Sequence, residues 1–137
     1  MNHVKETLLE NKISPSFHRI KVYEYLVKNK THPSVDTIYS ELHSVIPTLS
    51  KTTIYNNLKT FIEHGIVMPI TISENEVRYD ADITFHGHFK CTECGEVYDI
   101  FDIEKLCSKM ETVDGHRISD TQVYFRGICK SCLNNFK

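Results

Sequence analysis

The sequence lacks long apolar runs, internal repeats and low-complexity segments. None of its apolar runs approaches the roughly 18 residues that a membrane-spanning helix needs. The opening residues 1–6 lack the apolar core of a secretory signal peptide. With 40% hydrophobic and 25% charged residues, the composition is globular rather than disordered. We therefore expect a globular cytoplasmic protein, whose 137 residues suffice for one ordinary domain or two small ones.

The sequence also lacks a strong excess of charge, because its formal net charge is only -2. The two signs are unevenly distributed along the chain. Residues 1–60 carry eight Lys and Arg against five Asp and Glu, whereas residues 61–137 carry eight against thirteen. This distribution permits an N-terminal half that faces DNA, although many domains that bind no nucleic acid share it.

Five cysteines in a cytoplasmic chain are poorly suited to a disulfide framework. Two residues separate the members of each of two pairs, which lets both thiolates of a pair reach one tetrahedral ion. A redox-active dithiol needs only one such pair, and two unrelated reduced pairs are the remaining alternative. We expect a structural zinc site formed by Cys91, Cys94, Cys129 and Cys132.

Helical periodicity and capping residues divide the first half of the chain into four expected helices. They cover residues 3–11, 17–29 and 34–45, and a fourth runs from Ser50 to about residue 63. Two strands follow, at 66–71 and 76–83. Helix, turn, helix and hairpin is the order of a winged helix-turn-helix domain, but a small helical domain that does not touch DNA has the same pattern.

After residue 83 the pattern changes to a strand at 96–101, a short helix at 102–111 and a strand at 121–128. We expect Cys107, in the short helix, to be buried as a small apolar residue. The predicted fold class is therefore α+β. A winged helix-turn-helix DNA-binding domain at 1–80 precedes a small α/β metal-binding dimerisation domain at 81–137.

Histidines and carboxylates form a second group of potential ligands. His86 and His88 are two residues apart on an expected strand and so point to the same face. Asp80 and Asp99 are near enough in sequence to share a pocket with them, and nitrogen and carboxylate ligands together suit Fe²⁺ or Mn²⁺. Taken alone, His32 is a loop histidine with a local hydrogen bond. The other histidines are interpreted as ordinary surface residues: His3, His18, His43, His64 and His116.

The chain resembles the ferric uptake regulator family, and within it the peroxide-responsive branch. The resemblance spans nearly the whole length and depends on motifs that follow one another in the family's order. They are 31–34 (THPS) with 38–39 (IY), 50–58 (SKTTIYNNL), 77–80 (VRYD), 86–88 (HGH), the two Cys-x-x-Cys pairs, and Asp99. The resemblance implies a regulatory Fe²⁺ or Mn²⁺ ion held by His32, Asp80, His86, His88 and Asp99.

In that branch, bound iron promotes oxidation of a histidine ligand, and the candidates here are His32 and His86. Both acidic ligand positions are Asp, as in peroxide sensors, whereas iron sensors often use Glu. The chain departs from many relatives at residues 85–88 (FHGH) and 120–121 (DT), where histidines or an aspartate of a further metal site are replaced. We therefore expect no third site.

The helix after Ser50 is the expected recognition helix in the DNA major groove. Tyr55 and Asn56 can contact bases, Asn56 by pairing with adenine. Phosphate contacts are expected from Lys51, Thr52 and Lys59, and also from Arg19 near the N-terminus. The expected partners are a second copy of the chain and a palindromic, A/T-rich double-stranded operator.

The sequence thus predicts a metal-dependent transcriptional repressor that senses peroxide and is not an enzyme. The same architecture could instead sense the level of iron, manganese or zinc. A small metalloenzyme with an open coordination position is a more distant alternative. A plain zinc-ribbon interaction module would leave residues 1–80 unexplained.

Overall fold

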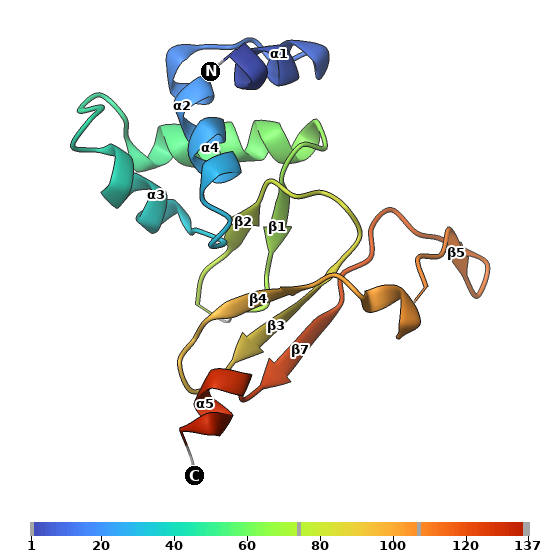
Figure 1. Ribbon diagram of the computed structural model, residues 1–137. Helices are drawn as coiled ribbons and strands as arrows, with labels where there is room; N and C mark the ends of the chain where they lie inside the picture. The colour runs from blue at the N-terminus through green and yellow to red at the C-terminus, as the bar shows by residue number, and fades with distance from the viewer. Residues whose placement is uncertain (1, 74, 107, 136–137) are drawn as a thin grey trace. The chain divides into compact units, whose positions relative to one another are not determined.

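The computed structural model describes residues 2–73, 75–106 and 108–135. The chain divides between Ile83 and Thr84 into two compact units (Figure 1). Helices dominate the first unit and short strands dominate the second. In the described part of the chain, none of the helices has both the length and the apolarity needed to cross a membrane.

Serine caps begin three of the four helices of the first unit. Ser16, Ser34 and Ser50 each accept a hydrogen bond from the backbone N–H three residues later. After the last of these helices, Gly65 adopts a left-handed φ of 75°, which ends the helix at little steric cost. The helices are α1 (Asn2–Glu10), α2 (Phe17–Lys28), α3 (Val35–Leu42) and α4 (Lys51–Glu63).

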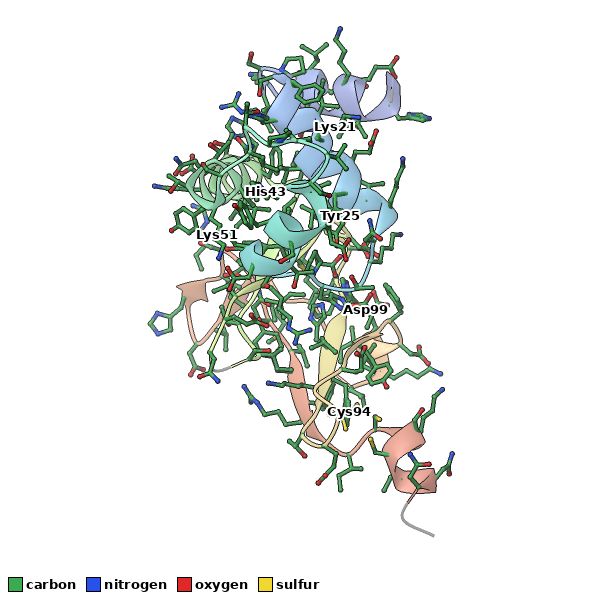
Figure 2. The ribbon with its side chains drawn as sticks, turned by 90° about the vertical axis from the view of Figure 1, so that its left-hand side faces the viewer. Lys21, Tyr25, His43, Lys51, Cys94 and Asp99 are labelled. Carbon is green, nitrogen blue, oxygen red and sulfur yellow. The ribbon has the colours of Figure 1, made fainter. Side chains whose placement is uncertain are left out.

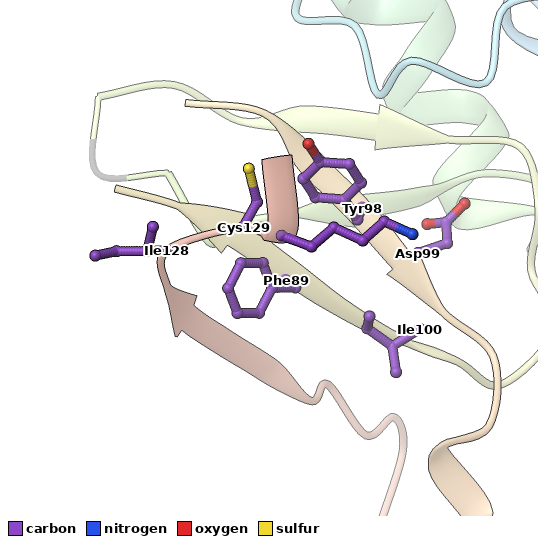
Figure 3. A pocket seen from close by; sticks show the side chains of 7 residues that line it. Phe89, Tyr98, Asp99, Ile100, Ile128 and Cys129 are labelled. Atoms are coloured by element: carbon purple, nitrogen blue, oxygen red, sulfur yellow. The ribbon is translucent and has the colours of Figure 1, made fainter. Parts of the chain in front are cut away.

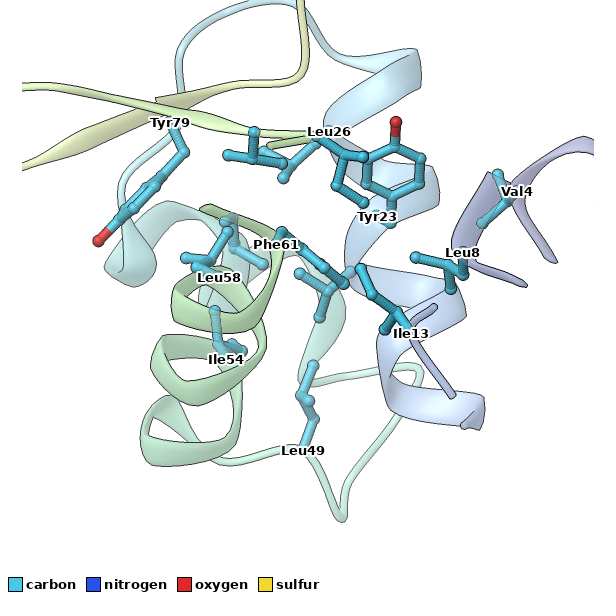
Figure 4. Close-up of a cluster of buried hydrophobic side chains, with 14 of the residues drawn as sticks. Val4, Leu8, Ile13, Tyr23, Leu26, Leu49, Ile54, Leu58, Phe61 and Tyr79 are labelled. Carbon is cyan, nitrogen blue, oxygen red and sulfur yellow. The ribbon is translucent and has the colours of Figure 1, made fainter. Parts of the chain in front are cut away.

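One hydrophobic core joins these helices (Figure 4). Ile54, Leu58 and Phe61 form the buried stripe of α4, as the sequence predicts. The ring of Phe61 meets that of Tyr23 edge-on, with 5.5 Å between centroids. The helix predicted at 34–45 is shorter in the structure, because α3 ends at Leu42 and Val45 is exposed rather than packed on the core.

A hairpin completes the first unit. Strands β1 (Met68–Ile70) and β2 (Arg78–Asp80) pair antiparallel and are shorter than predicted. The loop before α3 extends this sheet, because the N–H of Tyr79 donates to Pro33 O at 3.0 Å and Ser34 bridges Arg78. Helices α3 and α4 with this hairpin form the predicted winged helix-turn-helix fold.

The second unit is built on a three-stranded sheet in the order β4-β3-β7. Strand β3 (Gly87–Cys91) pairs antiparallel with β4 (Val97–Ile100) and parallel with β7 (Tyr124–Gly127). A hairpin of β5 (Thr112–Val113) and β6 (His116–Arg117) lies in the crossover between β4 and β7. The short helix α5 (Lys130–Asn134) follows β7.

The predicted helix at 102–111 is wrong. Only a single 3₁₀ turn, Ile103–Lys105, forms there among the described residues. Leu106 and Met110 are 71% and 51% exposed, so this segment lacks the buried stripe that stabilises short helices. The expectation that Cys107 is buried falls outside the described residues.

Candidate functional site

The parallel pairing of β3 and β7 brings the two Cys-x-x-Cys segments together. Cys91 ends β3 and lies in register with Gly127 of β7, two residues before Cys129. The N–H of Thr92 donates to Gly127 O at 2.7 Å and fixes this register. Cys129 then caps α5, because its sulfur accepts a hydrogen bond from the N–H of Cys132.

The four sulfurs have the geometry of a tetrahedral metal site. All lie within 4.8 Å of one another, and the pairs Cys91–Cys132 and Cys94–Cys129 are each 3.8 Å apart. Four sulfurs bound at about 2.3 Å to one tetrahedral ion are about 3.8 Å apart. Disulfide sulfurs are only about 2.05 Å apart. The cluster therefore fits a single ion with four thiolate ligands.

Backbone N–H groups stabilise thiolate at this cluster. Those of Cys94 and Cys129 donate to the Cys91 sulfur at 3.4 and 3.3 Å, and they lower the pKa of Cys91 to about 6. A hydrogen bond from the Tyr98 hydroxyl lowers the pKa of Cys129. The hydrogen bond between the Cys132 and Cys129 side chains raises the pKa of Cys132 to about 12. Four thiolates at this distance need a cation, which supports the metal assignment.

The sheet of the second unit also carries a group of apolar side chains next to the ligand candidates. Phe89, Tyr98 and Ile100 alternate with the ligand-bearing positions and line a hollow of about 360 Å³ (Figure 3). Cys129 and Lys130 close the hollow beside the cysteine cluster. Asp99 also lines this hollow, so the carboxylate that contacts the two histidines borders the apolar side chains as well.

In the first unit, His32 and Asp80 form one buried pair. The His32 Nε2 lies 3.5 Å from Asp80 Oδ2, and each side chain is nearly inaccessible. His32 has a left-handed φ of 56°, a conformation that costs a residue other than glycine about 1–2 kcal/mol. The N–H of Asp82 donates to Asp80 Oδ1 at 2.9 Å and orients this carboxylate. Backbone strain at a buried imidazole is a common mark of a functional residue.

In the second unit, His86 and His88 share one carboxylate. Their Nε2 atoms lie 3.2 and 3.3 Å from the same oxygen, Oδ1 of Asp99. The register explains this arrangement, since His88 and Asp99 are direct partners on β3 and β4. His86 immediately precedes β3 and reaches the same carboxylate, as its predicted spacing from His88 requires.

The tautomer of His86 favours a metal at its Nε2. Nδ1 lies 2.6 Å from Thr84 O, and a carbonyl oxygen can only accept, so Nδ1 carries a proton. In the neutral ring the Nε2 lone pair then points toward the Asp99 carboxylate. Metal-binding histidines are typically oriented in this way by a backbone carbonyl. Neighbouring ligands at about 2.1 Å from an octahedral ion lie about 3 Å apart, close to the distances found here.

The predicted DNA-contacting side chains of α4 are exposed. Tyr55 is 54% exposed, so part of its side chain reaches solvent on α4. Lys51 Nζ lies 3.0 Å from Asp36 Oδ1 and 5.4 Å from the centroid of the Tyr39 ring (Figure 2). Exposed positions of the same helix also include Thr52, Asn56 and Lys59.

Arg19 lies apart from this group, on α2. It is half-buried, and its Nη1 donates to Ser14 O at 3.0 Å.

Sequence reasoning missed two groups that orient the ligands. The Thr84 carbonyl carries no signal in its residue type, and Tyr98 is an ordinary strand aromatic in the sequence.

Comparison with known proteins identifies one family of regulators for this chain. The model of the ferric uptake regulator family matches residues 10–126. The peroxide operon regulator of Bacillus subtilis (strain 168) is 33% identical over 132 residues, which cover 93% of this chain and 89% of that protein. The peroxide-responsive repressor PerR of Staphylococcus aureus (strain USA300) is 34% identical over 119 residues, covering 83% and 78%.

A solved structure, the Campylobacter jejuni peroxide stress regulator, is similar over 96% of this chain and 97% of its own. Its TM-score is 0.69 and its sequence identity is 26%. The similarity therefore extends over both units of the chain, rather than over the winged helix alone.

Proposed function

The chain belongs to the ferric uptake regulator family, and from this premise we propose that it is a metal-dependent DNA-binding repressor that senses peroxide. The relatives are transcriptional regulators rather than enzymes. The observation that carries the proposal is the pair of incomplete ligand sets, one in each unit, that both combine buried imidazole with aspartate.

The regulatory ion is proposed to take ligands from both sets. His32 and Asp80 offer two ligands, too few for Fe²⁺ or Mn²⁺, and His86, His88 and Asp99 offer three. An ion bound by all five would restrict the two units to one arrangement. If that arrangement also binds DNA best, the ion raises operator affinity. The increase is set by how much more tightly the ion binds this arrangement than the others.

Bound iron would supply the redox chemistry that activates hydrogen peroxide. The chain's own part is to hold the imidazoles of His32 and His86 with Nε2 toward the ion. In the net reaction, one peroxide oxygen is inserted at a ring carbon and the other leaves as water. The oxidised ring is a poorer ligand, so the ion loses affinity and the repressor releases DNA. Aspartate at both acidic positions supports this reading, as do the peroxide regulators among the relatives.

Zinc is proposed for the four-cysteine cluster, where it would have a structural role. It would hold the ends of β3 and β7 and the start of α5 together. The second unit is also the proposed dimerisation surface. Its exposed apolar side chains support this assignment, and a two-fold dimer matches a palindromic operator. They include Leu106, Met110, Val113 and Leu133.

Helix α4 is proposed to enter the major groove of an A/T-rich operator. Tyr55 and Asn56 would contact base edges, and Lys51, Thr52, Lys59 and Arg19 would contact phosphates. For Lys51, this requires exchanging Asp36 for a phosphate, at little cost because that ion pair is exposed.

The Lys59→Ala variant tests the assigned phosphate contact. We expect weaker binding by a similar factor on every operator sequence, and a salt dependence whose slope falls by about one per subunit. Fluorescence anisotropy at several salt concentrations measures both. Glu63→Ala, which removes an exposed charge on the same helix, serves as the control. A loss confined to one base position would show that Lys59 contacts a base instead.

Peroxide sensing is tested by loading the protein with Fe²⁺ or Mn²⁺ and adding hydrogen peroxide. We expect the iron form to gain one oxygen, about 16 Da, on His32 or His86 and to release the operator. The manganese form should do neither. Peptide mass spectrometry locates the oxygen and anisotropy follows the DNA. Metal-dependent binding that survives peroxide without oxygen uptake would assign the protein to metal-level sensing.

A further inference from the structure

A partly exposed phenyl ring covers one face of a buried ligand candidate. Phe101 follows β4 directly, and its ring stacks on the imidazole of His86 at a centroid distance of 4.9 Å and an angle of 25°. The His86 side chain is 0% exposed, whereas Phe101 is 59% exposed. The Phe101 ring therefore lies between one face of the buried imidazole and the solvent.

The other contacts of His86 involve different parts of its ring. Thr84 O and Asp99 Oδ1 engage the two ring nitrogens, at opposite edges. The imidazole of His88 is tilted against it, at 4.6 Å and 58°. The contact with Phe101 is near-parallel, so the phenyl covers one face of the imidazole. Removing the phenyl would open that face without removing either nitrogen contact.

We propose that Phe101 is a shield that limits access of oxidants to His86 and so directs peroxide oxidation toward His32. The shield deepens the proposed function and rests on it. Oxygen insertion occurs at the ring carbon between the two nitrogens: hydrogen peroxide is reduced to water while the imidazole loses two electrons and gains oxygen. A reagent that approaches this carbon from the ring face meets the phenyl first.

The shield is testable without an ion in the regulatory site. Hydroxyl radicals generated by photolysis of dilute hydrogen peroxide add to accessible imidazole carbons, and peptide mass spectrometry assigns the oxidised residue. In protein that keeps its zinc but has no ion in the regulatory site, we expect the labelling rate of His86 to rise several-fold in Phe101→Ala. It should stay near the wild-type rate in Phe101→Leu, which keeps an apolar cover. Phe17→Ala is the matched control, because Phe17 is also 59% exposed but lies in the first unit.

A second arm uses the iron-loaded protein and hydrogen peroxide. In Phe101→Ala, the fraction of the added oxygen found on His86 should rise relative to that on His32, and Phe101→Leu should restore the wild-type ratio. Circular dichroism spectra show whether each variant is folded. Equal labelling of His86 in folded wild type and Phe101→Ala would overturn the shield, as would an unchanged ratio between the two histidines. Absence of oxygen uptake by the wild type would overturn the proposed function, and the labelling of the zinc-containing protein without iron would still decide the shield.

Discussion

At the residue scale, main-chain groups orient most of the proposed ligands. The Thr84 carbonyl fixes the tautomer of His86, the Asp82 N–H orients Asp80, and two N–H groups stabilise the Cys91 thiolate. Such contacts depend on backbone position rather than on the identity of the neighbouring side chain. Small changes of the backbone beside a ligand should therefore affect metal binding even when the ligand itself is unchanged.

Gly87, between His86 and His88, is the residue where this sensitivity is greatest. A Cβ there would lie 3.1 Å from Ile103 Cδ1 and 3.3 Å from Val123 O, and Val123 O also accepts the N–H of His88 at 3.0 Å. We expect Gly87→Ala to lower the free energy of unfolding of the second unit by about 1–3 kcal/mol through overpacking. It should also weaken Mn²⁺ binding.

Urea denaturation and Mn²⁺ titration measure these two effects. Gly127→Ala is a matched control on β7 of the same sheet, because its Cβ would meet only the Phe89 ring at an ordinary 3.4 Å. Equal stability and equal Mn²⁺ affinity in both variants would show that the backbone beside the histidines tolerates displacement.

At the element scale, the parallel pairing of β3 with β7 depends on the cysteine cluster. Both strands are short, and the ends that carry Cys91 and Cys129 meet at the sulfurs. Without an ion, the neighbouring sulfurs raise the pKa of Cys132 to about 12, so the four cysteines are not all thiolates and nothing binds them together. The ion is therefore expected to be part of the fold of the second unit, as in other small metal-stapled domains. The first unit has a separate hydrophobic core.

Removing zinc, by chelation or by Cys91→Ser, should unfold the second unit and leave the first folded. Hydrogen exchange followed by mass spectrometry should show lost protection in peptides from 84–106 and 108–135 and retained protection in helices α2 and α4. Ser131→Ala, an exposed change between two ligands, is the control. Simultaneous loss of protection in both units would show that they fold as one cooperative body.

Local signals predicted the elements of the first unit well and those of the second less well. Serine caps and an apolar period located α2, α3 and α4, since both signals lie within the segment itself. The β5–β6 hairpin was missed although Asp114 and Gly115, with φ of 49° and 81°, form a typical two-residue turn. Its flanking residues are all exposed, so no apolar alternation marks the strands.

Non-local pairing could not be predicted from periodicity. The spacing of the cysteines predicts a shared ion, but not that a parallel pair of strands would bring them together. In the same way, His86, His88 and Asp99 were grouped by their spacing. The role of His32 came only from the family resemblance, because nothing in its local sequence distinguishes it from an ordinary loop histidine.

At the scale of the whole molecule, the proposed regulatory ion would link the DNA-binding unit to the second unit, because each unit supplies some of its ligands. The first unit holds His32 and Asp80, and the second holds His86, His88 and Asp99. Thermodynamic linkage then requires reciprocity: the factor by which Mn²⁺ strengthens operator binding equals the factor by which operator strengthens Mn²⁺ binding. Manganese is the suitable probe because it does not carry out the proposed peroxide chemistry.

The most direct test therefore measures operator affinity against Mn²⁺ concentration for the wild type, His32→Ala and the surface control His3→Ala. We predict that Mn²⁺ raises the operator affinity of the wild type and of His3→Ala by about 5–150-fold, the usual range of allosteric coupling. His32→Ala should keep the weak metal-free affinity at every Mn²⁺ concentration. Operator binding by His32→Ala that still responds to Mn²⁺ as the wild type does would contradict the account.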